Sequence, residues 1–255
     1  MNGEAIARLS GGAAAVEVVS ETGSTNADLL ARAPRLSGNL LLVAERQSAG
    51  RGRAGRRWLS ADGGSLTFSL AWRFEAPLHA LRGLPLAVGV ALAEALDSMD
   101  VKVQLKWPND LLKDGAKLAG VLIETQAGAD GALWAIIGVG MNLSLPDELE
   151  AAIGRPVANA PWLAKMDRDA LMAALLAQLA RSLRQFEAEG FAAFAARWNR
   201  LHAWSGCEVA LQDGACVLQQ GLAAGVDDNG ALLLDTAAGR VAIMAGDVSL
   251  RMLEV

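Results

Sequence analysis

Cysteine and histidine are scarce in this 255-residue chain, and their scarcity excludes several kinds of site. The chain has two cysteines, Cys207 and Cys216, and two histidines, His79 and His202. Two cysteines without further Cys or His pairs supply neither a disulfide scaffold nor a zinc framework. We therefore interpret both cysteines as reduced core residues, which is compatible with the cytosol. Neither histidine lies in a motif described below, so general-base chemistry by histidine is not indicated.

Long apolar runs and an excess of positive charge are missing as well. Residues 1–20 contain no long apolar segment after a basic start, which argues against a signal peptide. No apolar run is long enough to cross a bilayer, and the net charge of -5 argues against a whole-molecule affinity for nucleic acid. The 53% hydrophobic and 20% charged residues are typical of a globular protein.

Apolar periodicity predicts both strands and helices up to residue 204. Strands are expected at 39–44, 65–72, 101–106, 118–125 and 133–139, the last two forming an antiparallel pair joined by a turn over 127–131. Helices are expected at 27–33, 86–99, 169–189 and 191–204, with Asp167 or Asp169 capping the long one and Gly190 ending it. Residues 1–19 are small and polar, and we expect a short lead-in there.

The pattern changes after Ser205-Gly206. Short apolar runs are separated by the turn sequences Asp213-Gly214, Asp228-Asn229-Gly230 and Ala238-Gly239, which are typical of an all-β unit. We therefore predict an α+β fold, with a mixed β-sheet and flanking helices over residues 1–204 and a small β-barrel over residues 205–255.

The most informative segment is Gly50-Arg51-Gly52-Arg53-Ala54-Gly55-Arg56-Arg57-Trp58, called the arginine loop (residues 50–58) below. Its glycines let the backbone turn tightly and bring N–H groups close to a ligand. Its arginines offer planar two-point contacts to phosphate or carboxylate. Because the protein is otherwise acidic, this positive cluster is local, and the loop is predicted to bind a small anion.

Other interpretations of the arginine loop are weaker. Gly50, Gly52 and Gly55 match the spacing of a dinucleotide-binding fingerprint, but that fingerprint opens a helix, whereas residues 58–64 lead into a strand. A P-loop is excluded because Gly-Lys-Ser/Thr is absent. A solvated basic turn gains nothing from alternating glycines, which cost backbone entropy. A nucleic-acid patch lacks a second basic cluster to support it.

Together with further motifs in the same order, the arginine loop resembles the signature of the biotin protein ligases. These motifs are Glu21-Thr22-Gly23-Ser24-Thr25-Asn26, Lys106-Trp107-Pro108-Asn109-Asp110, Lys117-Leu118-Ala119-Gly120-Val121-Leu122-Ile123-Glu124 and Gly138-Val139-Gly140-Met141-Asn142. The match spans residues 20–200 and continues into the C-terminal strands. It implies a class II synthetase-like catalytic domain followed by an SH3-like barrel.

The resemblance implies that biotin lies between the first motif and the arginine loop. The implied biotin-binding residues are Ser24, Thr25, Asn26, Gln47, Gly50, Arg51, Gly52, Arg53 and Lys117. Hydroxyl and amide groups suit a ureido ring, which has both donors and an acceptor. The same residues also fit an ordinary helix start, because Thr25 and Asp28 are close to a capping box. That structural role does not exclude binding of a polar head group.

The implied ATP and adenylate contacts come from Arg53, Arg56, Trp58, Lys106, Asn109 and Asn142. Lys106 would neutralise phosphate and Asp110 would hold Mg²⁺, although a Pro-Asn-Asp turn at a strand end explains part of this motif. Lys117 would contact the biotin carboxylate and the α-phosphate, although alone it would be a solvated strand end. Trp58 either belongs to the loop core or stacks on adenine. Residues 138–142 form either a tight turn or a backbone surface for the nucleotide.

The reaction implied has two steps. The biotin carboxylate attacks the α-phosphate of ATP to give biotinoyl-5′-AMP, and a carrier-protein lysine then displaces AMP. Catalysis by Lys117, Lys106, Arg51 and Arg53 would consist of positioning and charge neutralisation. The implied partner is a biotin carboxyl carrier protein, such as the acetyl-CoA carboxylase subunit, in the cytoplasm. We also expect the arginine loop to be mobile without ligand.

Alternatives remain at this point. A lipoate ligase or octanoyltransferase would share the fold, and a non-enzymatic biotin sensor would share the biotin site. Family members often pair through the catalytic sheet, so a homodimer is possible. About twenty residues precede Glu21, too few for the N-terminal helix-turn-helix of some members, so a monofunctional ligase without nucleic-acid or membrane partners is expected.

Overall fold

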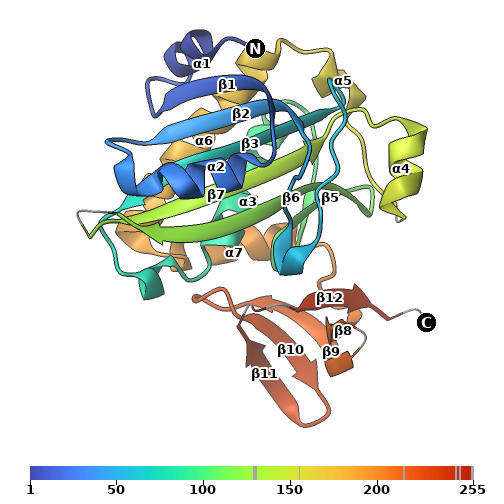
Figure 1. Cartoon of the computed structure of the whole chain (residues 1–255). Coiled ribbons are helices and arrows are strands. Elements are labelled where there is room, and N and C mark those ends of the chain that lie inside the picture. The colour runs from blue at the N-terminus through green and yellow to red at the C-terminus, as the bar shows by residue number, and fades with distance from the viewer. Residues whose placement is uncertain (129–130, 155, 215, 245, 247, 254–255) are drawn as a thin grey trace.

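Two β-sheets, one above the other in Figure 1, organise the computed structural model. The structure describes residues 1–128, 131–154, 156–214, 216–244, 246 and 248–253. Within these residues the larger sheet has seven strands and carries helices on both faces. The smaller sheet has five strands and comes from the C-terminal part of the chain. The predicted α+β class, with a mixed sheet and flanking helices, is confirmed.

The larger sheet has the order β1-β2-β3-β7-β6-β5-β4. Its strands are β1 (Ala15–Thr22), β2 (Leu40–Gln47), β3 (Ser65–Phe74), β4 (Gln104–Lys106), β5 (Asp110–Lys113), β6 (Ala116–Ala127) and β7 (Leu133–Asn142). The β1–β2 pair is parallel and the other neighbouring pairs are antiparallel. The turn predicted at 127–131 lies partly outside the described residues.

Helices cover the two faces of this sheet unequally. The helices are α1 (Gly3–Leu9), α2 (Thr25–Arg32), α3 (Leu84–Asp97), α4 (Asp147–Ile153), α5 (Pro161–Ala164), α6 (Arg168–Glu189) and α7 (Ala192–Leu201), with 3₁₀ turns η1 (Ala33–Arg35), η2 (Arg53–Gly55) and η3 (Leu78–Leu81). On one face α2 packs on the central strands, and on the other α3 packs on the sheet with α6 behind it (Figure 1). None of the helices in the described part of the chain combines the length and apolar character that a bilayer crossing requires.

The N-terminal segment corrects the sequence analysis. Residues 1–19 are not a lead-in, because they form α1 and most of β1. The Asn2 side chain caps α1, and Ile6 is fully buried in the main core. This helix has only seven residues, and β1 is an edge strand with little burial, so neither produces a strong apolar period. The segment therefore belongs to the larger sheet and its core.

Helix ends also differ in detail from the predictions. Ser24, not Thr25, caps α2 by accepting from the Ala27 N–H, and Asp28 accepts instead from the Thr22 hydroxyl at 2.5 Å. Asp167 caps α6 and Gly190 ends it, as expected. The following helix, α7, ends at Leu201 rather than at 204.

The C-terminal strands are β8 (Glu208–Asp213), β9 (Cys216–Val226), β10 (Leu232–Thr236), β11 (Gly239–Ile243) and β12 (Ser249–Met252). They form one antiparallel sheet in the order β11-β10-β9-β8-β12, which confirms an all-β unit. The closed SH3-like barrel and the division at residues 204/205 stay predictions. Both cysteines are free, but Cys216 is exposed and Cys207 is half-buried, so the prediction that both are core residues is wrong.

The two sheets share one apolar core. Val209, Leu232 and Leu250 from the small sheet belong to the same buried cluster as the interior of the large one. The fully buried Trp107 donates its indole N–H to the Gly230 carbonyl at 3.3 Å. Burial of a large side chain is worth roughly 1.5–3 kcal/mol, so this contact fixes the C-terminal sheet against the β4–β5 turn. That turn carries part of the site described next.

The central strands present small residues on the α2 face of the sheet. In β3, Ser65, Thr67 and Ser69 alternate with the buried Leu66, Phe68 and Leu70 of the main core. Thr67 and Ser69 pair with Gly140 and Gly138 of β7, which in turn pair with Gly120 and Leu122 of β6. This face therefore leaves room above the sheet next to α2.

Candidate functional site

A pocket lies over the small residues of the central strands. Its walls come from the start of α2, the arginine loop, the β4–β5 turn, β6, β7 and β12. It brings together most of the residues predicted from sequence, namely Ser24, Thr25, Asn26, Gln47, Arg51, Gly52, Arg53, Arg56, Trp58, Lys106, Asn109, Asp110 and Lys117. The remaining two predicted residues are Gly50 and Asn142. Gly50 packs against the Trp58 carbonyl within the loop. Asn142 lines an adjoining cavity, whose walls also include Arg56, Trp58 and Lys117.

The arginine loop folds back on itself as a short hairpin. Gly50 accepts the N–H of Trp58 at 2.9 Å, and Gly52 donates to the carbonyl of Arg56 at 2.7 Å. A β-carbon at Gly50 would lie 2.5 Å from the Trp58 carbonyl oxygen, so only glycine allows this crossing. Gly55 has φ +69°, where side chains are disfavoured. Strand β3 follows the loop, as predicted.

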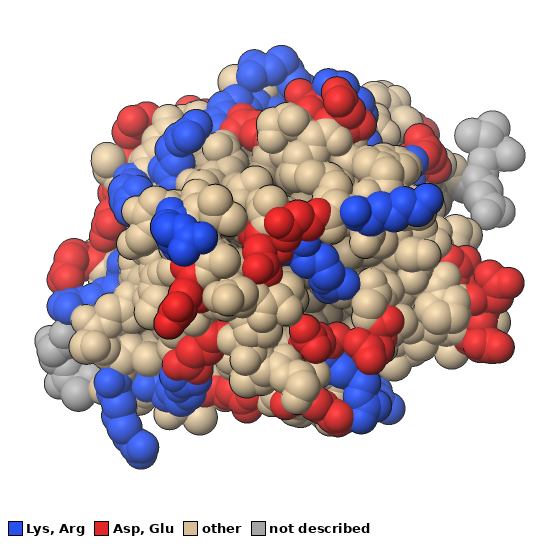
Figure 2. Space-filling model, turned by 90° about the horizontal axis from the view of Figure 1, so that it is seen from above, with Lys and Arg blue, Asp and Glu red and all other residues tan. Residues whose placement is uncertain are grey.

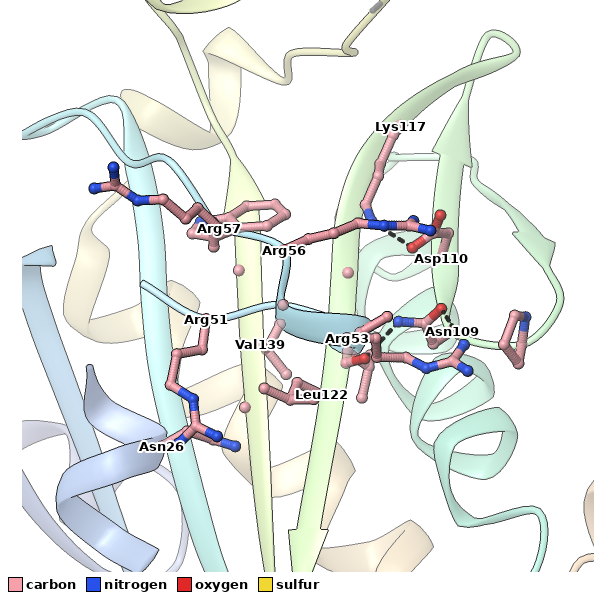
Figure 3. Close-up of a pocket in the computed structure, with 18 of the residues that line it drawn as sticks. Asn26, Arg51, Arg53, Arg56, Arg57, Asn109, Asp110, Lys117, Leu122 and Val139 are labelled. Carbon is pink, nitrogen blue, oxygen red and sulfur yellow. Dashed lines mark hydrogen bonds and ion pairs between the residues drawn. The ribbon is translucent and has the colours of Figure 1, made fainter. Parts of the chain in front are cut away.

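The four arginines of the loop point in different directions, as Figure 3 shows. Arg51 extends toward Asn26 of α2, Arg56 extends toward Lys117 and Asp110, and Arg57 points away from them. Arg53 donates to Asn109 Oδ1 at 3.2 Å and to the Gly246 carbonyl. The loop is thus bonded to the β4–β5 turn and to the C-terminal segment, and Arg51 extends toward α2.

Neutral hydroxyl and amide groups line the α2 end of the pocket. Ser24, Thr25 and Asn26 are each only 3–4% exposed. Gln47 Oε1 accepts the Thr25 N–H at 2.8 Å, and the Thr25 hydroxyl lies 2.7 Å from the Ser69 hydroxyl. Ser69 donates to Asn26 Oδ1 at 2.7 Å. The sequence analysis missed Ser69, although its place in an alternating strand gave a signal.

Glu124 joins this neutral end to the arginine loop. One carboxylate oxygen accepts from Asn26 Nδ2 at 2.9 Å, and the other accepts from Arg51 at 2.7 Å. The Glu124 side chain is 22% exposed. Its motif was recognised from sequence, but no role was assigned to this residue.

The opposite end of the pocket is cationic. The Lys117 ammonium donates to Asp110 at 2.5 Å, with both side chains less than 20% exposed, and lies 5.8 Å from the centre of the Trp58 ring. Lys106 stacks over Trp204 at 4.6 Å. Asn109 donates to the Val121 carbonyl at 2.7 Å, which ties the β4–β5 turn to β6. Cationic groups near one carboxylate suit a phosphate-bearing ligand.

Gly138 and Gly140 belong to a strand and not to a tight turn. Both pair within β7, and each makes room for a neighbour: a β-carbon would lie 2.3 Å from Asn26 Oδ1 at position 138 and 2.2 Å from the Trp58 ring at position 140. The turn interpretation of this motif is therefore wrong. Asn142 is buried and donates to the Lys117 carbonyl at 3.2 Å, so it also fixes the backbone of that lysine.

The donor set does not form a resident metal site. Among the described residues, no group of three or more His, Cys, Asp or Glu side chains could hold a metal ion. Among the described residues that line the pocket, Asp110 is the carboxylate, and Lys117 already pairs with it. Mg²⁺ often binds through one carboxylate together with substrate phosphates, so Asp110 fits only an ion that arrives with a nucleotide.

Comparisons with known proteins show which family the chain is similar to. Residues 16–142 match the model of the Biotin/lipoate A/B protein ligase family, and residues 205–251 match the Biotin protein ligase C terminal domain. The chain is 36% identical to the bifunctional ligase/repressor BirA of Escherichia coli, over 98% of this chain and 77% of that protein. It is also 36% identical to the biotin--[acetyl-CoA-carboxylase] ligase of Mycobacterium tuberculosis, over 91% and 88%.

A solved structure extends the similarity to three dimensions. The biotin protein ligase from Aquifex aeolicus, in complex with biotin and ATP, matches with a TM-score of 0.78 and 30% identity, over 93% of this chain and 99% of that one. The fold and pocket therefore define an acyl-activating ligase of the biotin and lipoate class. More narrowly, the chain belongs to the biotin protein ligase family, which confirms the resemblance predicted from its motifs.

Proposed function

We propose that this protein activates biotin with ATP as biotinoyl-5′-AMP and transfers it to a lysine of a biotin carrier protein. The observation that carries the proposal is the division of the pocket. Neutral hydroxyl and amide groups from Thr25, Asn26 and Gln47 occupy one end, and the cations Lys106, Lys117 and Arg56 occupy the other. A ureido ring with a carboxylate tail, followed by a nucleotide phosphate, has the same polarity along its length.

The first step needs charge neutralisation and no protein nucleophile. The biotin carboxylate oxygen attacks the α-phosphorus of ATP, the new C–O–P bond forms, and pyrophosphate leaves. Two anions must approach, so their repulsion is the main barrier that the protein can lower. Lys117 and Arg51 would neutralise the carboxylate and α-phosphate, while Arg53, Lys106 and Asn109 would hold the remaining phosphate and sugar groups.

The nucleotide would extend from Lys117 toward the adjoining cavity. Arg56, Trp58 and Asn142 line that cavity, and the Trp58 ring offers an aromatic face there. Stacking on adenine is part of the proposal, because Trp58 is held flat against Gly140. Gly50 and Gly52 would contact biotin only through the loop backbone.

Mg²⁺ would accompany ATP into the pocket. Asp110 is the residue that would hold it, through one carboxylate oxygen or through water, and the ion would supply neutralisation of phosphate charge.

In the second step the carrier lysine, as a free amine, attacks the acyl carbon, AMP leaves with the bonding electrons, and the ammonium proton is lost to solvent. A mixed anhydride hydrolyses readily, so the arginine loop would hold it until the carrier arrives. The proposed carrier is a biotin carboxyl carrier protein, the acetyl-CoA carboxylase subunit.

Further parts of the proposal concern partners and location. We propose a homodimer, a cytoplasmic location consistent with two free cysteines, and a ligase without a nucleic-acid partner. The net charge of -5 and the interspersed acidic and basic side chains on the face in Figure 2 support the last point. Sedimentation of the purified chain tests the dimer, and a DNA-binding assay tests the absence of a nucleic-acid partner.

Pyrophosphate release tests the first half-reaction. The purified chain, MgATP and biotin are expected to release pyrophosphate, and lipoate in place of biotin is expected to give only background. Release that depends on lipoate would favour the lipoate ligase alternative. Biotin binding without pyrophosphate release would favour a biotin sensor.

A further inference from the structure

Glu124 accepts hydrogen bonds both from Asn26, in the neutral wall at the α2 end of the pocket, and from Arg51 of the arginine loop. It therefore limits how both side chains can be oriented. An ionised carboxylate only accepts hydrogen bonds. Asn26 must therefore turn its NH₂ group toward Glu124, which leaves Asn26 Oδ1 to face Ser69. The orientation of this amide is fixed by its neighbour rather than by the fold of α2.

The orientation of Asn26 in turn fixes which group donates in each hydrogen bond of the neutral wall, from Asn26 through Ser69 to Thr25. Ser69 has one hydroxyl proton, and Asn26 Oδ1 can only accept it. The Thr25 hydroxyl has one proton and two neighbouring acceptors, the Ser69 oxygen at 2.7 Å and Gln47 Oε1 at 3.2 Å. Because the Ser69 proton is already used, the shorter contact is made by the Thr25 proton. Gln47 Oε1 keeps its bond from the Thr25 N–H at 2.8 Å. The protons of Thr25 and Ser69 then both point along the wall toward Asn26 and Glu124, and the lone pairs of Thr25 are left for a ligand donor.

The second carboxylate oxygen of Glu124 acts on the arginine loop. It holds one guanidinium nitrogen of Arg51, whose remaining N–H groups stay available in the pocket. Figure 3 shows the Arg51 side chain extended from the loop toward Asn26. The same carboxylate thus anchors the loop at its α2 side.

We propose that Glu124 is a positioning residue that sets the hydrogen-bond direction of the polar wall and anchors the arginine loop through Arg51. The inference rests on the proposed function, since an acceptor at Thr25 is what an N–H of the ureido ring requires. Glu124 does not touch the reacting atoms, and it acts through Asn26, Ser69 and Thr25.

Exchanging the carboxylate of Glu124 and the amide of Asn26 is expected first to reverse and then to restore the donor-to-acceptor direction of the hydrogen bonds in the wall. In Glu124→Gln the new NH₂ group can face Asn26, which then turns over. Ser69 then donates to Thr25 and occupies one of its two lone pairs, and the Thr25 proton turns to Gln47 Oε1, so a ligand donor meets one acceptor site fewer. Asn26→Asp alone places two carboxylates side by side. In the double variant, the carboxylate now at position 26 accepts from both the amide at position 124 and the Ser69 hydroxyl, and the original direction returns.

The affinity for biotin, measured by calorimetry without ATP, is compared among the original chain, the two single variants and the double variant. Each single variant is expected to weaken biotin binding about tenfold or more, the cost of one mispaired buried group, and the double variant to recover to within about threefold of the original chain. Glu94→Gln is the matched control, because Glu94 is likewise held by an arginine, Arg197, and an amide, Gln178, outside the pocket. A double variant no better than Glu124→Gln would overturn the proposal.

Trypsin digestion of the ligand-free protein tests the anchor without any substrate. Cleavage after the arginines of the loop is expected to be faster in Glu124→Ala than in Glu94→Ala, and equal rates would overturn the anchoring role. If the original chain neither binds biotin nor releases pyrophosphate, the proposed function fails, while the digestion still decides whether Glu124 anchors the loop.

Discussion

The indole ring of Trp58 lies against the backbone of Gly140, so closely that a β-carbon at position 140 would come within 2.2 Å of the ring. One residue belongs to the arginine loop and the other to the central strand β7. The contact sets the distance between the loop and the sheet, and hence the height of the pocket at its nucleotide end.

We predict that Gly140→Ala displaces Trp58 and lowers stability by roughly 1–3 kcal/mol, the usual cost of overpacking. The KM for ATP should rise as well. Gly38→Ala is the control, because a β-carbon there meets open space. In a Trp58→Ala background the alanine at 140 should cost much less. Additive effects in thermal unfolding would show that the two residues are not coupled.

Lys117→Gln is predicted to slow biotin-dependent pyrophosphate release by about 10²- to 10³-fold, since it removes a charge aimed at the transition state. The loss should lie in kcat more than in the KM for ATP. Lys113→Gln is the matched control, because Lys113 lies at the end of β5 and pairs with Asp114 in the turn that follows. If Lys117→Gln changed only KM, Lys117 would be a binding residue without a catalytic role.

Arg53→Ala is predicted to slow the first step, because one contact to the nucleotide is lost, and also to release the adenylate that still forms. Arg53 ties the arginine loop to Asn109 and to Gly246, so its loss should open the loop on the side of the C-terminal sheet. Bystander proteins in the mixture should become biotinylated, as blotting with streptavidin would detect. Arg57→Ala, which alters an arginine directed away from Arg56 and Asp110, should stay selective. A slow but fully selective Arg53→Ala enzyme would contradict the retention role.

The arginine loop is predicted to resist trypsin when biotin and ATP are both present. Its hairpin is held by three backbone hydrogen bonds within residues 50–58, whereas bound ligand would add charge-assisted contacts to several arginines. Cleavage within residues 51–57, followed by mass spectrometry, measures the change. Equal cleavage with and without the two ligands would argue that the loop is already rigid.

His202 makes stability depend on pH. Burial lowers the pKa of His202 from 6.5 to about 4, and neither ring nitrogen has a partner among the described residues. Between these values the unfolded chain binds a proton that the folded chain does not, so stability falls as the pH drops from about 6.5 toward 4. At about 1.4 kcal/mol per pH unit, the loss is limited to about 3 kcal/mol.

Thermal unfolding at pH 7 and pH 5 measures this effect. His202→Phe is expected to reduce the acid loss, because the aromatic contact with Trp198 can be kept without a titrating group. The exposed His79, changed to Gln, should leave the pH dependence as it is. Identical pH profiles for His202→Phe and the original chain would exclude His202 as the cause.

The sequence predicted the central fold well because its strands have strong patterns. The alternation from Ser65 to Trp72 marked both faces of β3, and the glycine after residue 189 marked the end of α6. The N-terminal α1 and β1 were missed because a seven-residue helix and a poorly buried edge strand carry too little apolar period.

The sequence predicted most of the residues that line the site, but it did not predict the hydrogen bonds among them. Ordered motifs indicated which segments converge, and most of their polar residues do line one pocket. The alternation of β3 indicated which face Ser69 occupies, but the hydrogen-bond partners of Ser69 and Glu124 depend on the register between strands, which no local pattern encodes. The glycines of the arginine loop were ascribed to tight turning and ligand access, and the structure adds a specific requirement, because Gly50 makes a close crossing with the Trp58 carbonyl.

Transfer of biotin to a carrier is the central claim, and mass spectrometry of the carrier tests it most directly. A purified biotin carboxyl carrier domain is incubated with this protein, biotin and MgATP, with a carrier whose target lysine is replaced by arginine as the control. The account predicts a mass increase of one biotin less one water on the intact carrier only. An unmodified carrier, or modification with lipoate in place of biotin, would contradict it.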